Sequence, residues 1–492
     1  MLGLLLCGMI VILNQSTMKN KILLLPILFM AAACSKEPAT PVETPEFKDR
    51  SVDPLMATIF PEFSGKVKAY TFIGSSDVIP GSPAFVYGGA PDGQGFLKNP
   101  DGTGYVMVTN HENTWAVSRL YLDKKLNIVK GEYIVDTDGG MFRLCSATLA
   151  TPEEHGFPKP TFLTTGESNV NAMTHAIDPL GPSNPKDQTR VLPALGKFSG
   201  ENAVPLSKNA YPGKTVIILG EDAGNGQVYL YVSNSVGDLQ NGKLYVLRRK
   251  DKNQIEKAIV KGSVYDVEFV EVPNAKNLTG AEIEALNTSL GSIQFARVED
   301  LDYRRGSAAN NRELFFVATG VSGSTDKTYW GRAYQLSMNE TNPLEGKLQV
   351  IEDGDLDPGK GIINPDNLCA TENYLYIQED GDSFFPGASH DSYIWQYDFK
   401  TKTKKPFITP RNTDAAILGS KFNPTSDQRK ATWEWGAMID ISDEIGVPNT
   451  FMVNLHMHTW IEGDKFLNPS KANSVQSYKA GGQTILLTGV PR

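Results

Sequence analysis

The stretch Phe295-Ala-Arg297-Val-Glu299-Asp300-Leu-Asp302 places one arginine and three carboxylates within six residues, shortly before the apolar run Leu314–Thr319. The apolar run predicts a buried strand. Because alternate residues of a strand share a face, Arg297 and Glu299 are expected to project to one side and Asp300 to the other. The group is either a surface ion pair, contributing ~0–1 kcal/mol, or a hard-cation site with an arginine that can hold a phosphate.

Six runs of β-branched and aromatic residues end in a similar polar cluster that carries carboxylates or histidines. They are Tyr105–Glu112, Thr161–Glu167, Val216–Asp222, Arg297–Asp302 with Leu314–Thr319, Tyr374–Asp382 and Phe451–His458. This spacing predicts an all-β chain, a β-propeller of six blades whose inner strands bring these ends together in one acidic channel. Short inserted helices are expected only at Thr279–Ser289 and Asp251–Val260. The alternative is a set of unrelated loop carboxylates.

Composition narrows the class of protein. The 492 residues include 45 Gly and 30 Pro with only 21% charged residues, which favours many turns and little exposed helix. The formal net charge of −9 and the pI near 5.4 argue against a nucleic-acid surface, which needs basic stripes. Clustered acids suit divalent cations better.

The N-terminal segment predicts export and a lipid anchor. A basic region at Lys19–Lys21 and an apolar region at Ile22–Met30 precede Ala31-Ala-Ala-Cys34, an order similar to the lipobox of bacterial lipoproteins. Residues 1–33 are therefore interpreted as a signal region with a true start at Met18, 34–53 as a lipidated Cys34 with a flexible tether, and 54–492 as a single propeller domain. The location expected is the periplasm or outer membrane of a bacterium. The alternative is an ordinary signal peptide cleaved near Ala33.

The sequence leaves several roles open for two cysteines and for the histidines. Cys145 and Cys369 could pair, stay free and buried, or bind a metal as thiolates, because sequence does not supply disulfide geometry. His155 and His390 are expected on the surface, and His111 and His175 are expected to be structural. His456 and His458 alternate on one face of a strand, a spacing compatible with metal binding.

Several short motifs stand in a fixed order between Gly104 and Trp460. They are Thr109-Asn-His-Glu112, Arg143-Leu-Cys145, Thr164-Thr-Gly-Glu167, Phe198-Ser-Gly-Glu201, Gly220-Glu-Asp222, Arg297-Val-Glu-Asp300, Pro365-Asp-Asn-Leu368 and Glu434-Trp-Gly436. Their order resembles that of the PhoX-type alkaline phosphatase family, secreted bacterial phosphatases with a six-bladed propeller and a calcium–iron centre.

The resemblance implies roles for particular residues. Glu201 and Glu299 would be metal ligands, and Arg297 would hold the phosphate, so that Arg297 and Glu299 are the expected catalytic residues. Further candidates for calcium are Glu167, Asp222, Asp300, Glu379 and Glu434. Gly166 stands where one family segment has Cys. An Fe³⁺ site would therefore need Cys145, whereas Ca²⁺ needs only the carboxylates.

The resulting hypothesis is an extracytoplasmic, metal-dependent phosphomonoesterase that acts on small phosphate esters. It is expected to be a monomer, to contact a membrane through its lipid anchor and to bind no nucleic acid. A second hypothesis is a non-catalytic calcium-binding propeller lipoprotein whose partner is a glycan or a protein. A third is another hydrolase on the same fold, of lactonase or phytase type, because fold alone does not determine chemistry.

Overall fold

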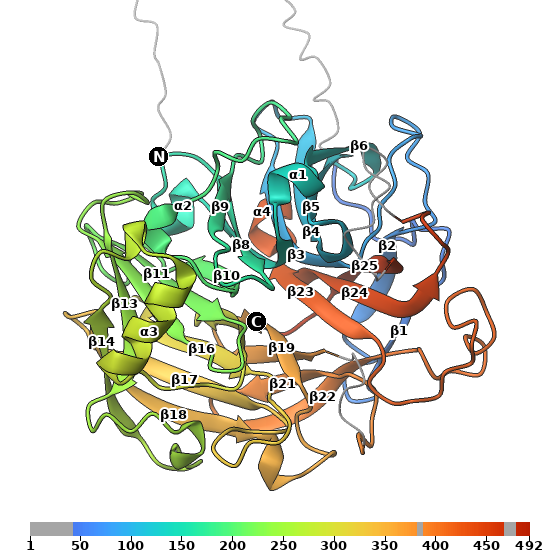
Figure 1. Ribbon diagram of the computed structural model, residues 1–492. Helices are drawn as coiled ribbons and strands as arrows, with labels where there is room; N and C mark the ends of the chain where they lie inside the picture. The colour runs from blue at the N-terminus through green and yellow to red at the C-terminus, as the bar shows by residue number, and fades with distance from the viewer. Residues whose placement is uncertain (1–42, 381–386, 467–478) are drawn as a thin grey trace, which may run out of the picture. The chain divides into compact units, whose positions relative to one another are not determined.

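Antiparallel sheets arranged around a common centre form the domain (Figure 1). The computed structural model describes residues 43–380, 387–466 and 479–492. Residues 1–33, the predicted lipidation site Cys34 and the first part of the predicted tether lie outside the described residues. By its contacts the chain divides into Met1–Glu43 and Thr44–Arg492, and the sheets belong to the second unit.

The first half of the chain supplies three groups of strands. Strands β3 (Pro91–Lys98), β4 (Gly104–His111), β5 (Ala116–Asp123) and β6 (Ile128–Val135) form one sheet, and β7 (Arg143–Ala150), β8 (Thr161–Glu167) and β9 (Thr174–Ile177) form another. The strands β10 (Gly200–Pro205), β11 (Thr215–Glu221), β12 (Val228–Ser233), β13 (Lys243–Arg249) and β14 (Tyr265–Glu271) follow. They pair in chain order from β10 to β14.

The second half continues in the same manner. Strands β15 (Val298–Tyr303), β16 (Glu313–Ala318), β17 (Arg332–Met338) and β18 (Glu345–Asp353) pair in order, and β18 joins β14, so that β10–β18 make one nine-stranded sheet. Then come β19 (Pro365–Ala370), β20 (Tyr374–Glu379), β21 (Ile394–Asp398) and β22 (Thr403–Pro410), followed by β23 (Glu434–Asp440), β24 (Thr450–Ile461) and β25 (Ala480–Thr488). The strand predicted at Leu314–Thr319 is β16.

The first strand of each of these groups lies at the centre. Strand β3 contacts β7, and the contacts continue through β10, β15, β19 and β23 back to β3. This closed ring makes the fold all-β and propeller-like, as the sequence predicts. One part of the prediction is wrong: five of the six predicted strand ends belong to β4, β8, β11, β20 and β24, which are second strands, and only Arg297–Asp302 lies on an innermost strand.

Two N-terminal strands complete sheets made from the end of the chain. Strand β1 (Ala57–Ile59) pairs with β22, and β2 (Lys68–Gly74) pairs with β25. The segment before them is held as well, because the Arg50 guanidinium donates to the carbonyls of Glu46 and Lys125, and the Arg50 amide donates to Thr71. The predicted tether therefore does not reach Asp53, since residues 46–53 are hydrogen-bonded to the domain.

Helices are few and short. The longest in the described residues is α3 (Gly280–Leu290), where Thr279 and Glu282 form a capping box, which confirms the helix expected at Thr279–Ser289. The others are α1 (Thr137–Gly140), α2 (Pro152–His155) and α4 (Ser442–Ile445), with 3₁₀ turns at Glu112–Thr114, Pro193–Leu195, Glu256–Ala258, Ala275–Asn277, Asn310–Arg312 and Gly354–Leu356. The second expected helix is only the turn Glu256–Ala258. No helix in the described ranges is long and apolar enough to cross a membrane.

Every innermost strand carries a β-bulge at the same place. The register shifts lie between Pro91 and Gln94, Leu144 and Ala147, Gly200 and Ala203, Val298 and Leu301, Pro365 and Leu368, and Trp435 and Met438. In each case two residues oppose one residue of the second strand, which bends the strand and redirects the side chains that follow. The bulge thus repeats around the ring although the sequence does not.

Packing of the innermost strand β23 can be tested at Trp435, which is fully buried and donates its indole N–H to the Ser392 carbonyl over 3.0 Å. Replacement of Trp435 by Ala should lower the free energy of unfolding by about 3–5 kcal/mol, because it removes a large core side chain and leaves a cavity. Val264→Ala, at a 57% exposed position, is the matched control. Equal melting temperatures for the two variants would contradict this packing.

Candidate metal centre

In five of the six innermost strands, the first residue of the bulge has a side chain that can bind a metal ion. These bulge positions carry Asp92, Cys145, Glu201, Glu299, Asp366 and Gly436. The sixth strand carries glycine at this position for a steric reason: a Cβ at Gly436 would lie only 2.9 Å from Asp92 Oδ1. The repeated bulge therefore collects ligand-type side chains that are up to 274 positions apart in the sequence.

The second strands add another ring at one common register position, which we call the strand-end position. It is the residue of the second strand that follows the pairing partner of the residue just before the bulge. Pro91, for example, precedes the first bulge and pairs with His111, so Glu112 stands at the strand-end position there. The residues there are Glu112, Glu167, Asp222, Thr319, Asp380 and His456. Five of the six can bind a cation, which is the regularity that the strand ends showed in the sequence.

Four groups of these side chains could hold a metal ion, with ligand atoms within 4.8 Å of one another. The groups are Glu201, Glu299 and Asp366; Asp92, Cys145 and Glu201; Glu112, Cys145 and Glu167; and Glu434, His456 and His458. Glu201 and Cys145 each belong to two groups, so three of the groups are linked. The structure thus brings together Glu201, Glu299, Glu167, Glu434 and Cys145 from the predicted set.

Burial and mutual repulsion set the protonation of these acids. Burial, and then the neighbouring carboxylates, raise the pKa of Asp92, Glu201, Glu299 and Asp366 well above the usual range. The same two causes raise the pKa of Glu167 to about 7, although Arg143 opposes them. A buried carboxylate that is surrounded by others favours either a proton or a cation. This donor set therefore fits a hard cation.

Two arginines stand at equivalent positions of the ring, each two residues before a bulge position. Arg297 makes a bidentate pair with Asp222, at 2.6 and 3.0 Å, and its Nη2 lies 2.9 Å from Glu299 Oε1. Arg143 Nη1 lies 2.9 Å from Glu112 Oε1. The two guanidinium side chains are 32% and 29% exposed, so each can still reach a ligand. The predicted common side of Arg297 and Glu299 is confirmed.

Cys145 rather than residue 166 carries sulfur into the site. The Cys145 thiol donates to Glu167 Oε2 over 2.9 Å, and burial raises its pKa. Both Cys145 and Cys369 are free, so they form no disulfide with each other. A Cβ at Gly166 would lie 3.0 Å from Ala172 Cβ and 3.1 Å from Phe142 Cβ, on the side of β8 opposite to Glu167. A cysteine there would not reach the carboxylates.

Three predicted ligands stay outside the four groups: Asp222, which pairs with Arg297, and the two carboxylates of Asp300 and Glu379. Asp300 accepts hydrogen bonds from Asn202 Nδ2 at 2.6 Å and from the Leu368 amide at 3.0 Å, which link β15 to its neighbours. Glu379 accepts from two backbone amides and from the Trp395 indole. Both carboxylates are therefore occupied by structural hydrogen bonds.

The surface prediction for two histidines is wrong. His155 and His390 are both buried. His155 Nδ1 accepts from the Thr151 amide, and its Nε2 lies 3.3 Å from the Tyr303 hydroxyl. His390 stacks on Tyr393. Polar neighbours in the sequence concealed these contacts, of which only the one between His155 and Tyr303 joins residues distant in the chain.

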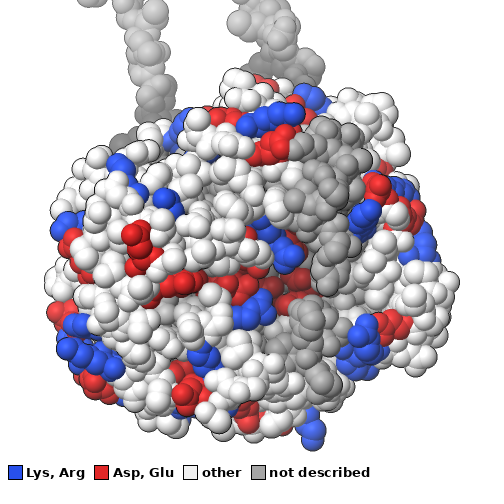
Figure 2. Space-filling view, in the orientation of Figure 1, with Lys and Arg blue, Asp and Glu red and all other residues white. Residues whose placement is uncertain are grey.

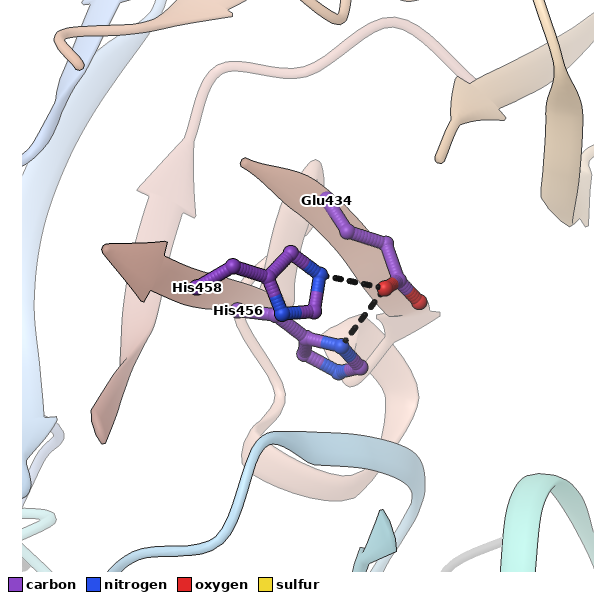
Figure 3. A group of neighbouring side chains, drawn as sticks. All are labelled: Glu434, His456 and His458. Carbon is purple, nitrogen blue, oxygen red and sulfur yellow. Dashed lines mark hydrogen bonds and ion pairs between the residues drawn. The ribbon is translucent and has the colours of Figure 1, made fainter. Parts of the chain in front are cut away.

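The fourth group lies on β23 and β24 (Figure 3). His458 Nε2 is 2.9 Å and His456 Nδ1 is 3.1 Å from the same oxygen, Oε2 of Glu434. Burial lowers the pKa of His456, but Glu434, Asp92 and Glu112 together raise it by more, to about 10. Burial also acts to raise the pKa of Glu434, yet the two imidazoles outweigh it and the pKa is lowered.

A cavity of about 690 Å³ lies on the other side of the bulges. It is lined by residues that follow the bulge positions, including Ser146, Asn202 and Asp300, and by the C-terminal Arg492. The Arg492 guanidinium pairs with Asp440 over 2.6 Å.

Figure 2 shows acidic side chains gathered in a hollow near the middle of one face of the domain.

Sequence reasoning missed Asp92, Asp366, Glu112 and Arg143 as site residues. Glu112 ends a predicted strand, and Asp366 and Arg143 lie inside the family motifs, so their signal was present. Asp92 stands in Pro91-Asp-Gly-Gln-Gly, which has the composition of a turn. Only the bulge register shows that this segment is an innermost strand.

A closed ring of sheets around buried side chains of metal-ligand type defines a propeller-like fold with a candidate metal centre. Residues 173–428 match the family described as Alkaline phosphatase PhoX. This match spans slightly more than half of the 492 residues, and the chain belongs to that family.

A solved structure of a PhoX protein shows the same fold. The structure of Pseudomonas fluorescens PhoX in complex with vanadate is 13% identical with a TM-score of 0.58, and the alignment covers 88% of this chain and 97% of that one. The α-L-arabinanase of Penicillium chrysogenum with arabinobiose is 12% identical with a TM-score of 0.38, covering 85% and 98%. A comparison with curated proteins found no match.

The raised pKa values of these carboxyl groups predict how the free energy of unfolding of the metal-free protein depends on pH. Because the folded state holds these protons more tightly than the unfolded state, stability falls as pH rises from about 5 to 8. A bound cation replaces the protons, so added Ca²⁺ should raise the melting temperature most at pH 8. Melting curves with EGTA and with Ca²⁺ at each pH measure this. Curves that do not respond to either addition would contradict cation binding by these acids.

Proposed function

We propose that the protein is a metal-dependent phosphomonoesterase whose substrate binds at the N-terminal ends of the innermost strands. The observation that carries this proposal is the pairing of Arg297 with the group Glu201, Glu299 and Asp366. A partly exposed guanidinium beside buried carboxylates offers a planar donor for two phosphoryl oxygens next to a cation site. Membership of the PhoX family supports the proposal, as does the complex of Pseudomonas fluorescens PhoX with vanadate, a transition state analogue.

The residues fit calcium, and Cys145 adds a ligand that suits iron. The linked groups contain carboxylates and a buried thiol, and Asp92 Oδ1 is buried with no hydrogen-bond partner among the described residues. Glu201, Glu299 and Asp366 would hold Ca²⁺ through oxygen, and Cys145 with its neighbours would hold Fe³⁺. Such ions, when bound, polarise phosphoryl oxygens and lower the pKa of water.

The chain itself would bind and orient the phosphate. Arg297, held by Asp222, would donate to two oxygens of the transferring group and offset their growing negative charge. Arg143 stands at the equivalent position two groups of strands earlier and would approach the same centre beside Cys145. Two fixed guanidinium groups therefore limit the orientation of the ester.

Further parts of the proposal concern architecture and location. We interpret the nine-stranded sheet as two blades, β10–β14 and β15–β18, joined through β14 and β18, which gives six blades in all. A lipid anchor at Cys34 and an extracytoplasmic location are proposed on the sequence pattern of Lys19–Cys34. The protein is proposed to act as a monomer on small phosphate esters. A non-catalytic calcium-binding propeller is the alternative.

Purified protein with Ca²⁺, and with iron supplied during expression, should hydrolyse p-nitrophenyl phosphate at alkaline pH. Arg297→Ala should reduce kcat/KM on the order of 100-fold or more, because it removes a donor to the transition state. Arg297→Lys should restore little, since an ammonium cannot make the bidentate contact. Glu299→Ala should cost more than Arg297→Ala, because it removes a metal ligand.

Arg248→Ala is the matched control, since Arg248 pairs with Glu268 at a distance from the site, and its activity should equal that of wild type. Gly166→Cys should not raise iron content, whereas Cys145→Ser should lower it. Folded, calcium-loaded wild type that is inactive across metals and pH would refute the phosphatase and favour the calcium-binding alternative.

The anchor is tested separately by Cys34→Ala. Loss of the acylated sulfur should move the protein from the membrane fraction to the soluble fraction, since an acyl chain supplies the membrane affinity. Thr40→Ala, in the predicted tether after Cys34, serves as control. Membrane partitioning that Cys34→Ala leaves unchanged would exclude the lipid anchor.

A further inference from the structure

We infer that Glu434, His456 and His458 bind a transition-metal ion at a site of their own, chemically distinct from the carboxylate groups that suit calcium. The inference concerns metal binding and does not require phosphatase activity. It rests on the geometry of the three side chains, the burial of His456 and the place of the group in the repeated register.

The distances match a coordination site. Metal bonds of about 2.1 Å at angles between octahedral and tetrahedral values place neighbouring ligand atoms about 3.0–3.4 Å apart. Glu434 Oε2 lies 2.9 Å from His458 Nε2 and 3.1 Å from His456 Nδ1. Two of the three distances are thus already near the spacing that one ion would require, and all three ligand atoms lie within 4.8 Å of one another.

His456 is a buried imidazole without a hydrogen bond. It is fully buried, and neither of its ring nitrogens has a hydrogen-bond partner among the described residues. Its Nδ1 lies within ion-pair distance of Glu434 and 3.6 Å from Glu112 Oε2. A buried polar atom that lacks a hydrogen bond is costly, and a metal ion shared with Glu434 would give Nδ1 a partner.

The register shows how this part of the ring differs from the others. Glu434 occupies the position that Arg143 and Arg297 occupy on β7 and β15, two residues before the bulge position. His456 occupies the strand-end position that carries Glu112, Glu167 and Asp222 elsewhere. At these two positions a carboxylate thus replaces an arginine, and an imidazole replaces a carboxylate. His458, two residues along β24, adds a second imidazole to the same carboxylate oxygen, which one ion pair does not need.

Donor chemistry selects the kind of metal. Two imidazoles and one carboxylate suit Zn²⁺, Fe²⁺ or Co²⁺, whereas Ca²⁺ takes six to eight oxygens. Three protein ligands leave coordination positions open. The His458 side chain is 21% exposed, so the site is open to solvent on that side and water or a substrate oxygen could complete it.

Cobalt is the probe, because Co²⁺ bound by nitrogen ligands absorbs visible light. Protein stripped of metal should bind Co²⁺ with a visible band that persists in a large excess of Ca²⁺ and that remains in Cys145→Ser, which removes the thiolate of the other ligand set. His456→Gln and His458→Gln should each weaken that binding on the order of 100-fold or more, because loss of even an outer partner of a ligand costs 10–100-fold. Binding is measured by titration, with metal content as a second readout.

His175→Gln is the matched control. His175 is also buried with neither ring nitrogen hydrogen-bonded among the described residues, but it lies on β9 outside the four groups, so its variant should keep the cobalt band. If His456→Gln does not fold, His458→Gln decides, because that side chain is partly exposed. A band that Ca²⁺ abolishes in wild type, or that His458→Gln leaves unchanged, would overturn the inference.

Discussion

Repulsion between buried carboxylates is the constraint on which the rest of this domain depends. Asp92, Glu201, Glu299 and Asp366 lie in groups so close that burial and neighbouring acids raise the pKa of each. Arg297 acts to lower the pKa of Glu299 and Arg143 acts to lower that of Glu167, but burial and the neighbouring acids outweigh both arginines. A fold that holds such groups without a cation must keep them protonated, so proton and metal compete for the same oxygens.

The repeated bulge is the backbone device that makes this arrangement possible. A regular strand would send consecutive residues to opposite faces, whereas two residues share one partner in a bulge. At Glu201-Asn202 and Glu299-Asp300 the first residue joins a metal-binding group, and the second joins neighbouring sheets through the Asn202–Asp300 and Asp300–Leu368 hydrogen bonds. Ligand placement and inter-sheet contact therefore depend on the same two residues.

The sequence predicted the second strands well and the innermost strands poorly. Runs such as Val216–Asp222 contain the β-branched residues that mark strands, whereas Pro91–Lys98 contains Pro, Asp and Gly, which mark turns. The family motifs identified Glu201, Glu299, Arg297 and Cys145, but they could not show that Asp300 and Glu379 are used by backbone amides. That distinction depends on bulge register, which alternation along one strand does not reveal. The burial of His155 and His390 was missed for another reason, because the polar residues around them in the sequence do not reveal their contacts with Tyr303 and Tyr393.

The pairing of β1 with β22 and of β2 with β25 has a consequence for the order of assembly. The first strands to leave the ribosome have no partners until the last ones arrive, so the ring cannot close during synthesis. Until then the contact between β3 and β23 is missing, and Asp92 lacks the neighbouring wall that buries it. An unfinished or truncated chain would therefore hold its acids apart in water, where they bind cations weakly. The proposed metal binding would therefore follow completion of the chain.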